Sequence, residues 1–126
     1  MKGGYLMHHI TNGQTGNLEI QVTENLTINR TGKKGDEVLS TPSLLELMEQ
    51  CSMNATDHLL AEGYTTVGYA VDQMRHLAPT GIGQKVRIEA ILTDVNKNRL
   101  TYTINAFQGK EKIGMAIHKR AIISIQ

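Results

Sequence analysis

STPSLLELMEQC, residues 40–51, is the stretch that decides the fold, because it begins the one long helix predicted for this chain. Thr41 is a good N-cap, since its hydroxyl can accept a hydrogen bond from an unpaired N–H of the first helical turn. Pro42 then takes the first helical position, where a missing N–H costs nothing and the fixed φ is already helical. Apolar side chains follow on one helix face, at steps of four, three, four and four residues: Leu44, Met48, Cys51, Ala55 and Leu59. The pattern predicts a deeply buried helix over residues 42–62, ended by Gly63.

β-Strand patterns lie on both sides of this helix. Before it, residues 18–22 alternate apolar and polar side chains, and the pattern can continue through residues 26–28. After it, four strands are predicted, mostly joined by hairpin turns: 65–74, 85–95, 100–107 and 112–125. This order indicates an α+β fold with a largely antiparallel sheet of about five strands. Because the helix is apolar over a wide arc, we expect the sheet to curl around it. The unpaired edges of the sheet favour a dimer.

Composition limits the classes of function. With 126 residues the chain is most simply one domain, and residues 1–16 form a loose, glycine-rich lead-in. The net charge of +1 gives no reason to expect nucleic acid or a membrane surface as a partner. The N-terminus lacks the apolar run of a signal peptide, and no segment approaches the roughly 20 apolar residues of a membrane span. The single cysteine, Cys51, fits a reducing compartment and a core position, so a cytoplasmic location is expected.

No metal site is expected. The sequence has no CxxC or HExxH motif, and the adjacent His8 and His9 have no carboxylate or cysteine cluster beside them. These two histidines are most simply a solvated tail.

Three polar residues have the chemistry of an acyl-transfer site. Thr41 stands at a helix start, where backbone N–H groups favour negative charge. Glu49 lies two turns further on, at the margin of the buried face. His76 follows a strand and precedes a proline break, so it should lie at the end of the sheet, where a histidine can transfer protons near neutral pH. A hydroxyl, a histidine and a carboxylate suit acyl transfer, although an N-cap, a surface carboxylate and a solvated histidine explain the same residues. His118, which alternates with Arg120 on the last strand, fits a solvated face equally well.

Four segments together resemble one known family. They are TPSLLELME at residues 41–49, VGYAV at 67–71, RHLAPTGIG at 75–83 and IHKR at 117–120. In this combination the chain resembles the hotdog-fold thioesterases related to fluoroacetyl-CoA thioesterase, and the resemblance covers about residues 17–125. It implies a single hotdog domain over residues 17–126, in which each long central helix is wrapped by its own sheet. It also implies a homodimer, with a tetramer as a further option, and active sites at the dimer interface.

The same resemblance implies hydrolysis of a short-chain acyl-CoA thioester without a cofactor, since coenzyme A is part of the substrate. The family's threonine at the helix start, glutamate eight residues on and histidine before the Ala-Pro segment correspond to Thr41, Glu49 and His76. Gly68 would offer a backbone N–H near the thioester carbonyl. The phosphates of coenzyme A need cations, and the candidates are Arg120, which lies in the family-like last strand, and then Lys33, Lys34 and Lys119.

One departure from the family leaves the acyl group open. The fluoroacetyl enzyme closes its acyl pocket with aromatic side chains just before the threonine, and residues 32–39 contain none. The role of Glu49 also stays open between water activation and direct attack to form an anhydride. The alternative function is a non-catalytic acyl-CoA carrier or sensor on the same fold. A hydratase ranks last, because Asp72 and His76 are followed by a proline break instead of a helix.

Overall fold

The computed structural model describes residues 9–125 of the chain. Its strands are β1 (Thr15–Gln21), β2 (Thr27–Ile28), β3 (Val38–Leu39), β4 (Tyr64–His76), β5 (Lys85–Asn96), β6 (Arg99–Gln108) and β7 (Glu111–Ser124). The long helix is α2 (Thr41–Thr56), and the 3-10 turns are η1 (Glu24–Leu26) and η2 (Asp57–Leu59). Within residues 9–125, no helix is long and apolar enough to cross a membrane, and no three potential ligand side chains are grouped around a metal position. Half of the lead-in, residues 1–8 with His8, lies outside the described residues; β1 begins at Thr15.

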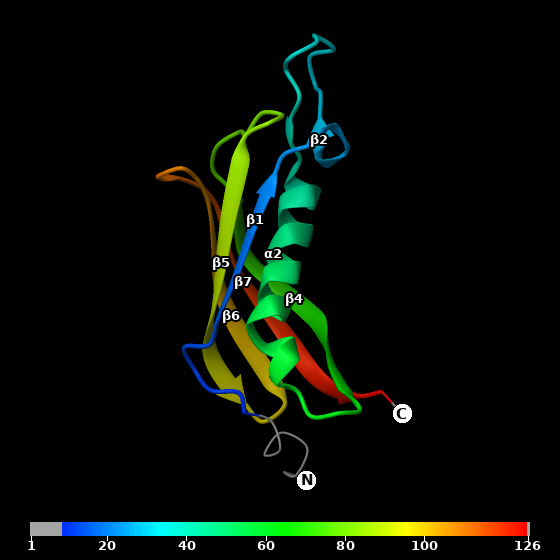
Figure 1. Cartoon of the computed structure of the whole chain (residues 1–126), viewed down its shortest axis with the longest axis vertical. Coiled ribbons are helices and arrows are strands. Elements are labelled where there is room, and N and C mark those ends of the chain that lie inside the picture. The colour runs from blue at the N-terminus through cyan, green and yellow to red at the C-terminus, as the bar shows by residue number, and fades with distance from the viewer. Residues whose placement is uncertain (1–8, 126) are drawn as a thin grey trace.

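Five strands form one antiparallel sheet in the order β1-β5-β6-β7-β4. The sheet curves behind α2, which lies across its concave face (Figure 1) and packs mainly against β1 and β5. The α+β fold with one long helix on a largely antiparallel, five-stranded sheet is therefore confirmed. The expected continuation of the first strand is wrong, because the chain turns at η1 and β2 pairs with β3 in a small separate sheet beside the helix start.

The helix begins one residue earlier than predicted, and its cap is Ser40 instead of Thr41. Ser40 is extended (φ −78°, ψ 154°), and its hydroxyl accepts a hydrogen bond from the Ser43 N–H at 3.2 Å. Thr41 and Pro42 are therefore the first two helical residues. Because Ser40 caps the helix, the Thr41 hydroxyl is available for another partner.

The helix also ends earlier than predicted, at Thr56 instead of residue 62. Thr56 has a φ of −133°, which leaves the helical range, and the chain tightens into η2. The side chain of Asp57 accepts a hydrogen bond of 2.7 Å from the hydroxyl of Thr66 in β4, which ties this end of the helix to the sheet. Gly63, with a φ of 87°, forms the turn into β4.

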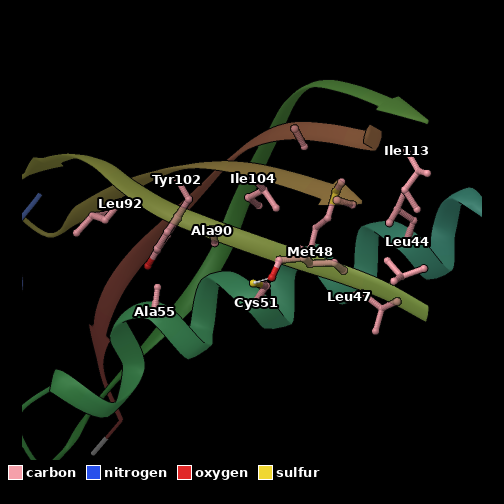
Figure 2. Packing of buried hydrophobic residues seen from close by; sticks show 14 of the residues in the cluster. Leu44, Leu47, Met48, Cys51, Ala55, Ala90, Leu92, Tyr102, Ile104 and Ile113 are labelled. Atoms are coloured by element: carbon pink, nitrogen blue, oxygen red, sulfur yellow. Dashed lines mark hydrogen bonds between the residues drawn. The ribbon is translucent and has the colours of Figure 1, made fainter. Parts of the chain in front are cut away.

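The core lies between the apolar face of α2 and the inner face of the sheet (Figure 2). Fully buried helix side chains meet fully buried side chains of β5, β6 and β7, among them Leu44, Met48, Cys51, Ala55, Ile88, Ala90, Leu92, Tyr102, Ile104 and Ile113. Cys51 is thus the core residue that the helix pattern predicted. Gly16 of β1 permits the closest approach, since a Cβ there would lie 2.4 Å from the Cys51 carbonyl oxygen.

Strand β4 is an edge strand with two irregularities. Tyr69 has no partner in β7, and neither do Gln73 and Met74. Gln73 has a φ of 53°, an uncommon conformation for a residue other than glycine. These bulges bend β4 on its way to His76. His76 lies at the end of the sheet as predicted, but it is the last residue of β4 and pairs with Gly114 of β7 instead of following the strand.

Candidate active site

The first residue of α2 and the last residue of β4 meet at the N-terminal end of the helix. The Thr41 hydroxyl oxygen lies 2.8 Å from Nδ1 of His76. The backbone next to His76 is held by a 2.7 Å hydrogen bond from the Leu77 N–H to the Ile113 carbonyl of β7. Two residues 35 positions apart in the sequence are thereby brought into the contact that the acyl-transfer hypothesis requires.

The surroundings of His76 favour the neutral form of its imidazole. Burial lowers the pKa of its imidazole below the ordinary value of 6.5. A neutral imidazole can accept the Thr41 hydroxyl proton at Nδ1, and its own hydrogen is then on Nε2. Among residues 9–125, Nε2 is buried and has no hydrogen-bond partner. A buried polar nitrogen without a partner costs free energy, so this atom is where a further group is needed.

An apolar cavity of about 310 Å³ lies next to the Thr41–His76 pair. Its walls come from β2, β3, the helix start and the segment after β4: Ile28, Val38, Leu39, Ser40, Thr41, His76, Leu77, Ala78 and Pro79. None of these lining residues is charged, and none is phenylalanine, tyrosine or tryptophan. The cavity suits an aliphatic group next to a reactive hydroxyl.

Glu49 lies elsewhere in the same chain. It is eight residues beyond Thr41, which corresponds to about 12 Å along the helix axis. There it lines a cavity of about 460 Å³ together with Thr66, Gly68 and Arg120. It also borders a neighbouring cavity of about 290 Å³ that includes Gly68 and His118. The predicted set is therefore divided within one chain into a Thr41–His76 pair and a second group around Glu49.

Arg120 and His118 point inward, so the alternative of a solvated face on the last strand is wrong for both residues. The exposed fraction is 5% for Arg120 and 2% for His118. Arg120 donates from Nε to the Thr66 hydroxyl and from Nη2 to the Thr66 carbonyl, both at 2.9 Å. Its Nη1 lies 3.2 Å from Nε2 of His118, whose Nδ1 lies 3.0 Å from the Ala70 carbonyl oxygen. The guanidinium is thus held on three sides at the wall of the Glu49 cavity.

These contacts favour one protonation state and one tautomer of His118. Burial is the main cause that lowers its pKa, and the charge of Arg120 lowers it further, while the Ala70 hydrogen bond and Glu49 act in the opposite direction. A neutral ring donates its Nδ1–H to Ala70 and accepts from Arg120 at Nε2. His118 therefore serves as a spacer between the backbone of β4 and the guanidinium. A sequence signal for this existed, because His118 and Arg120 continue the inward alternation that Gly114, Ala116 and Ile122 also follow.

Gly68 packs directly on this pair. A Cβ at Gly68 would lie 2.9 Å from Cε1 of His118 and 3.2 Å from Nη1 of Arg120. A side chain would thus collide with the two residues that wall the cavity. The first bulge of β4, at Tyr69, follows immediately. Gly68 lines both cavities that Glu49 borders.

Comparison with known proteins decides the family. Residues 22–126 match the sequence model of the family described as fluoroacetyl-CoA-specific thioesterase (FlK). The chain belongs to the FlK family. The fluoroacetyl-CoA thioesterase of Streptantibioticus cattleyicolor is 32% identical over 90 residues, which are 71% of this chain and 64% of that enzyme's length.

Solved structures agree with this assignment. The fluoroacetyl-CoA thioesterase FlK superposes with a TM-score of 0.81 at 26% identity, covering 92% of this chain and 90% of the other. A hot-dog-like protein from Thermanaerovibrio acidaminovorans gives a TM-score of 0.82 at 25% identity, covering 98% and 89% of the two chains. The fold of this FlK-family member is thus the hotdog fold expected from the four sequence segments.

Proposed function

We propose that this chain is an acyl-CoA thioesterase that hydrolyses a short-chain acyl-CoA at a site shared between two copies. Thr41 and His76 come from one subunit, and the partner subunit's Glu49 completes the set. The observation that carries the proposal is the unpartnered Nε2 of His76, whose other nitrogen already contacts Thr41. Family membership supports thioester hydrolysis, and a variant of FlK has been crystallised with fluoroacetate and CoA. No cofactor is needed in this scheme, because coenzyme A enters with the substrate.

Strand β4 is the natural place for the second copy. It lies at one edge of the sheet and is 13 residues long. Its Val67 and Tyr69 are exposed by 42% and 46%. A long edge with exposed apolar side chains is favourable for antiparallel pairing with an identical strand. We therefore propose a homodimer built on β4, and a tetramer would require a further surface.

The spacing of the two groups is consistent with a two-fold axis. Gly68 and His76 lie four residues on either side of Asp72 in β4. Thr41 and Glu49 are likewise eight residues apart on α2. A two-fold axis that passes near Asp72, level with the middle of the Thr41–Glu49 segment, places each end of a pair beside the opposite end of the same pair in the second subunit. It would bring Thr41 and His76 of one subunit to Gly68 and Glu49 of the other.

The chemistry follows from these positions. The attacking oxygen, either that of Thr41 or a water bound to its hydroxyl, loses its proton to Nδ1 of His76. The partner subunit's Glu49 accepts the Nε2 hydrogen bond and stabilises the imidazolium. The N–H of the partner subunit's Gly68 donates to the oxyanion, a contribution of about 3 kcal/mol for a well-placed donor. The tetrahedral intermediate then expels the CoA thiolate, which takes the proton held by His76. If Thr41 is the nucleophile, the acyl group remains as an ester on its oxygen, and a water that loses its proton to His76 hydrolyses this ester to the free acid and regenerates Thr41.

Mass spectrometry after a single turnover tests the nucleophile. An acyl group found on Thr41 marks direct attack by the hydroxyl. An acyl group on Glu49 marks the anhydride route. An unmodified chain marks attack by water.

Mixed dimers test the shared site. Thr41→Ala and Glu49→Ala proteins are each expected to be inactive. When the two are unfolded and refolded together, half of the dimers are heterodimers with one intact site of two, so about a quarter of the wild-type activity should return. The matched control mixes Thr41→Ala with His76→Ala, whose defects lie in the same half-site, and no activity should return. If heterodimers form and neither mixture recovers, the shared site is wrong.

A panel of acyl-CoA thioesters tests the reaction itself. Release of free thiol that depends on Thr41 and His76 establishes a thioesterase and ranks the acyl groups. Binding of acyl-CoA without thiol release would instead favour the carrier or sensor function.

We place the protein in the cytoplasm, where its single Cys51 stays reduced.

A further inference from the structure

The loop that joins β2 and β3, residues 29–37, begins and ends at the cavity beside Thr41. Ile28, just before the loop, and Val38, just after it, are paired across the small sheet, and both line that cavity. In Figure 1 the loop extends beyond the N-terminal end of α2. A ligand whose reactive end reaches Thr41 therefore has this loop beside the mouth of its cavity.

Three cationic side chains of this loop have no ion-pair partner among residues 9–125. Arg30, Lys33 and Lys34 are all exposed. The ion pairs among the described residues use other cations, Arg87 and Lys119. No charged residue lines the neighbouring cavity. With three cations and the two carboxylates Asp36 and Glu37, the loop has a net charge of +1 beside a cavity without charged lining residues.

The two acidic residues of the loop are tied to its frame. The Asp36 carboxylate accepts from the Thr31 hydroxyl at 2.7 Å. The Glu37 carboxylate accepts from the Gly35 N–H at 2.9 Å and from the Asn29 amide at 3.2 Å. Hydrogen bonds from backbone N–H groups, its own first, lower the pKa of Glu37. The acids therefore hold the loop together instead of pairing with its cations.

The loop is also ordered before any ligand binds. The side-chain oxygen of Asn29 accepts from the N–H groups of Thr31 and Gly32 at 3.1 and 2.8 Å. Its amide donates to the Lys33 carbonyl at 2.9 Å, and the Lys33 N–H donates to the Thr31 hydroxyl at 3.0 Å. Gly32 and Gly35 supply positive φ angles of 79° and 98°. A preformed loop has little ordering cost to overcome when it binds a ligand.

We propose that this loop binds the phosphate groups of coenzyme A through Arg30, Lys33 and Lys34. The inference rests on the proposed thioesterase function and names the part of the chain that recognises the nucleotide end of the substrate. The other cations considered for this role, Arg120 and Lys119, already interact with other residues of the chain. Arg120 is buried on Thr66 and His118, and Lys119 lies 3.5 Å from Asp72.

The test compares two thioesters of the same acyl group, one of coenzyme A and one of pantetheine, which lacks the phosphates. The variant replaces Arg30, Lys33 and Lys34 with alanine. KM for the CoA thioester should rise about tenfold at low ionic strength, because charge-assisted contacts to phosphate are lost. The kcat for both thioesters and the KM for the pantetheine thioester should stay unchanged. Salt should raise the wild-type KM for the CoA thioester toward that of the variant.

The control removes two other exposed cations at the β6–β7 hairpin, Lys110 in its turn and Lys112 near the start of β7, and should leave both KM values unchanged. An equal KM change for both thioesters in the loop variant would overturn the proposal, since the loop would then only shape the cavity. An unchanged KM for the CoA thioester would overturn it as well. Calorimetric binding of free coenzyme A against pantetheine gives the same comparison without turnover. This measurement separates failure of the phosphate site from failure of the thioesterase function.

Discussion

The Thr41 hydroxyl lies 2.8 Å from Nδ1 of His76, and this hydrogen bond joins the first residue of α2 to the last residue of β4. The contact exists because Ser40 performs the capping that would otherwise occupy the threonine side chain. It pairs a hydroxyl with a base whose neutral form is favoured by burial. Each consequence can be measured.

Removal of the Thr41 hydroxyl should lower kcat. Thr41→Val keeps the shape of the side chain, so the helix cap on Ser40 and the fold should be retained. Because the proton path to His76 is lost, kcat should fall by about 100- to 10,000-fold. Thr41→Ser restores the hydroxyl and should retain most of the activity. Steady-state kinetics with thiol detection measure the effect, and a Thr41→Val protein with wild-type kcat would contradict the assigned role.

Activity should persist below the ordinary pKa of histidine. His76 must be neutral to accept a proton, and burial lowers its pKa below 6.5. The acid limb of the kcat/KM profile should therefore lie below pH 6.5, which the free enzyme's pH profile reports. A limb at or above pH 6.5 would show that burial does not determine the pKa of His76 in the active protein, the outcome that a carboxylate such as the partner subunit's Glu49 at Nε2 would produce.

Stability should fall at acid pH for the same physical reason. His76 and His118 both have lowered pKa values in the folded state, chiefly through burial. The unfolded chain therefore binds protons first as pH decreases from about 6.5, and the stabilisation present above that pH is lost as pH falls through the lower folded values. Urea unfolding at pH 7.5 and pH 5 should show this loss. His118→Asn should reduce the difference between the two pH values.

Gly68→Ala should damage the Glu49 cavity. The new methyl group would lie 2.9 Å from the His118 ring and 3.2 Å from the Arg120 guanidinium. Overpacking of this kind costs about 1–3 kcal/mol in the free energy of unfolding, and it should also lower kcat. Gly81→Ala is the control. The nearest atom to its new methyl group would be the Glu37 carbonyl oxygen, at 4.0 Å, and the φ of Gly81 is not in the left-handed region. Equal stability of the two variants in urea would refute the close packing at Gly68.

Cys51 should be inert in the native protein. Burial raises the pKa of its thiol to about 11, and its side chain has no exposed surface. A disulfide reagent should therefore label it only in denaturant, since the thiolate is the reactive form. Rapid labelling of the native chain at pH 8 would show that the core opens readily.

Most of the fold could be predicted because it depends on local periodicity. Alternation in β5, β6 and β7 and the apolar face of α2 identify the sheet, the helix and the core residue Cys51. The helix ends were wrong because competing signals stand close together. Ser40 and Thr41 are both acceptable caps, and the end at Thr56 depends on contacts with β4 that local sequence does not specify.

The site was predicted in its residue types but not in its arrangement. Thr41 and His76 do meet, whereas Glu49 belongs to a different group in the same chain. Inward positions for His118 and Arg120 were missed because a charged side chain at a strand position is usually solvated. Their burial depends on Thr66 and Ala70 of β4, which supply hydrogen-bond acceptors from a distant part of the sequence.

The sequence by itself determined the order of the long helix and the five main strands, the apolar faces and the family, since these follow from periodicity, turn residues and four recognisable segments. Only the tertiary structure decided which polar groups are neighbours. Strand β4 is the edge strand of the sheet and bends at two bulges, and it places His76 beside Thr41 and Gly68 in the lining of the Glu49 cavity. Hydrogen-bond partners are determined by distances of about 3 Å in space, and separation along the chain does not encode such distances.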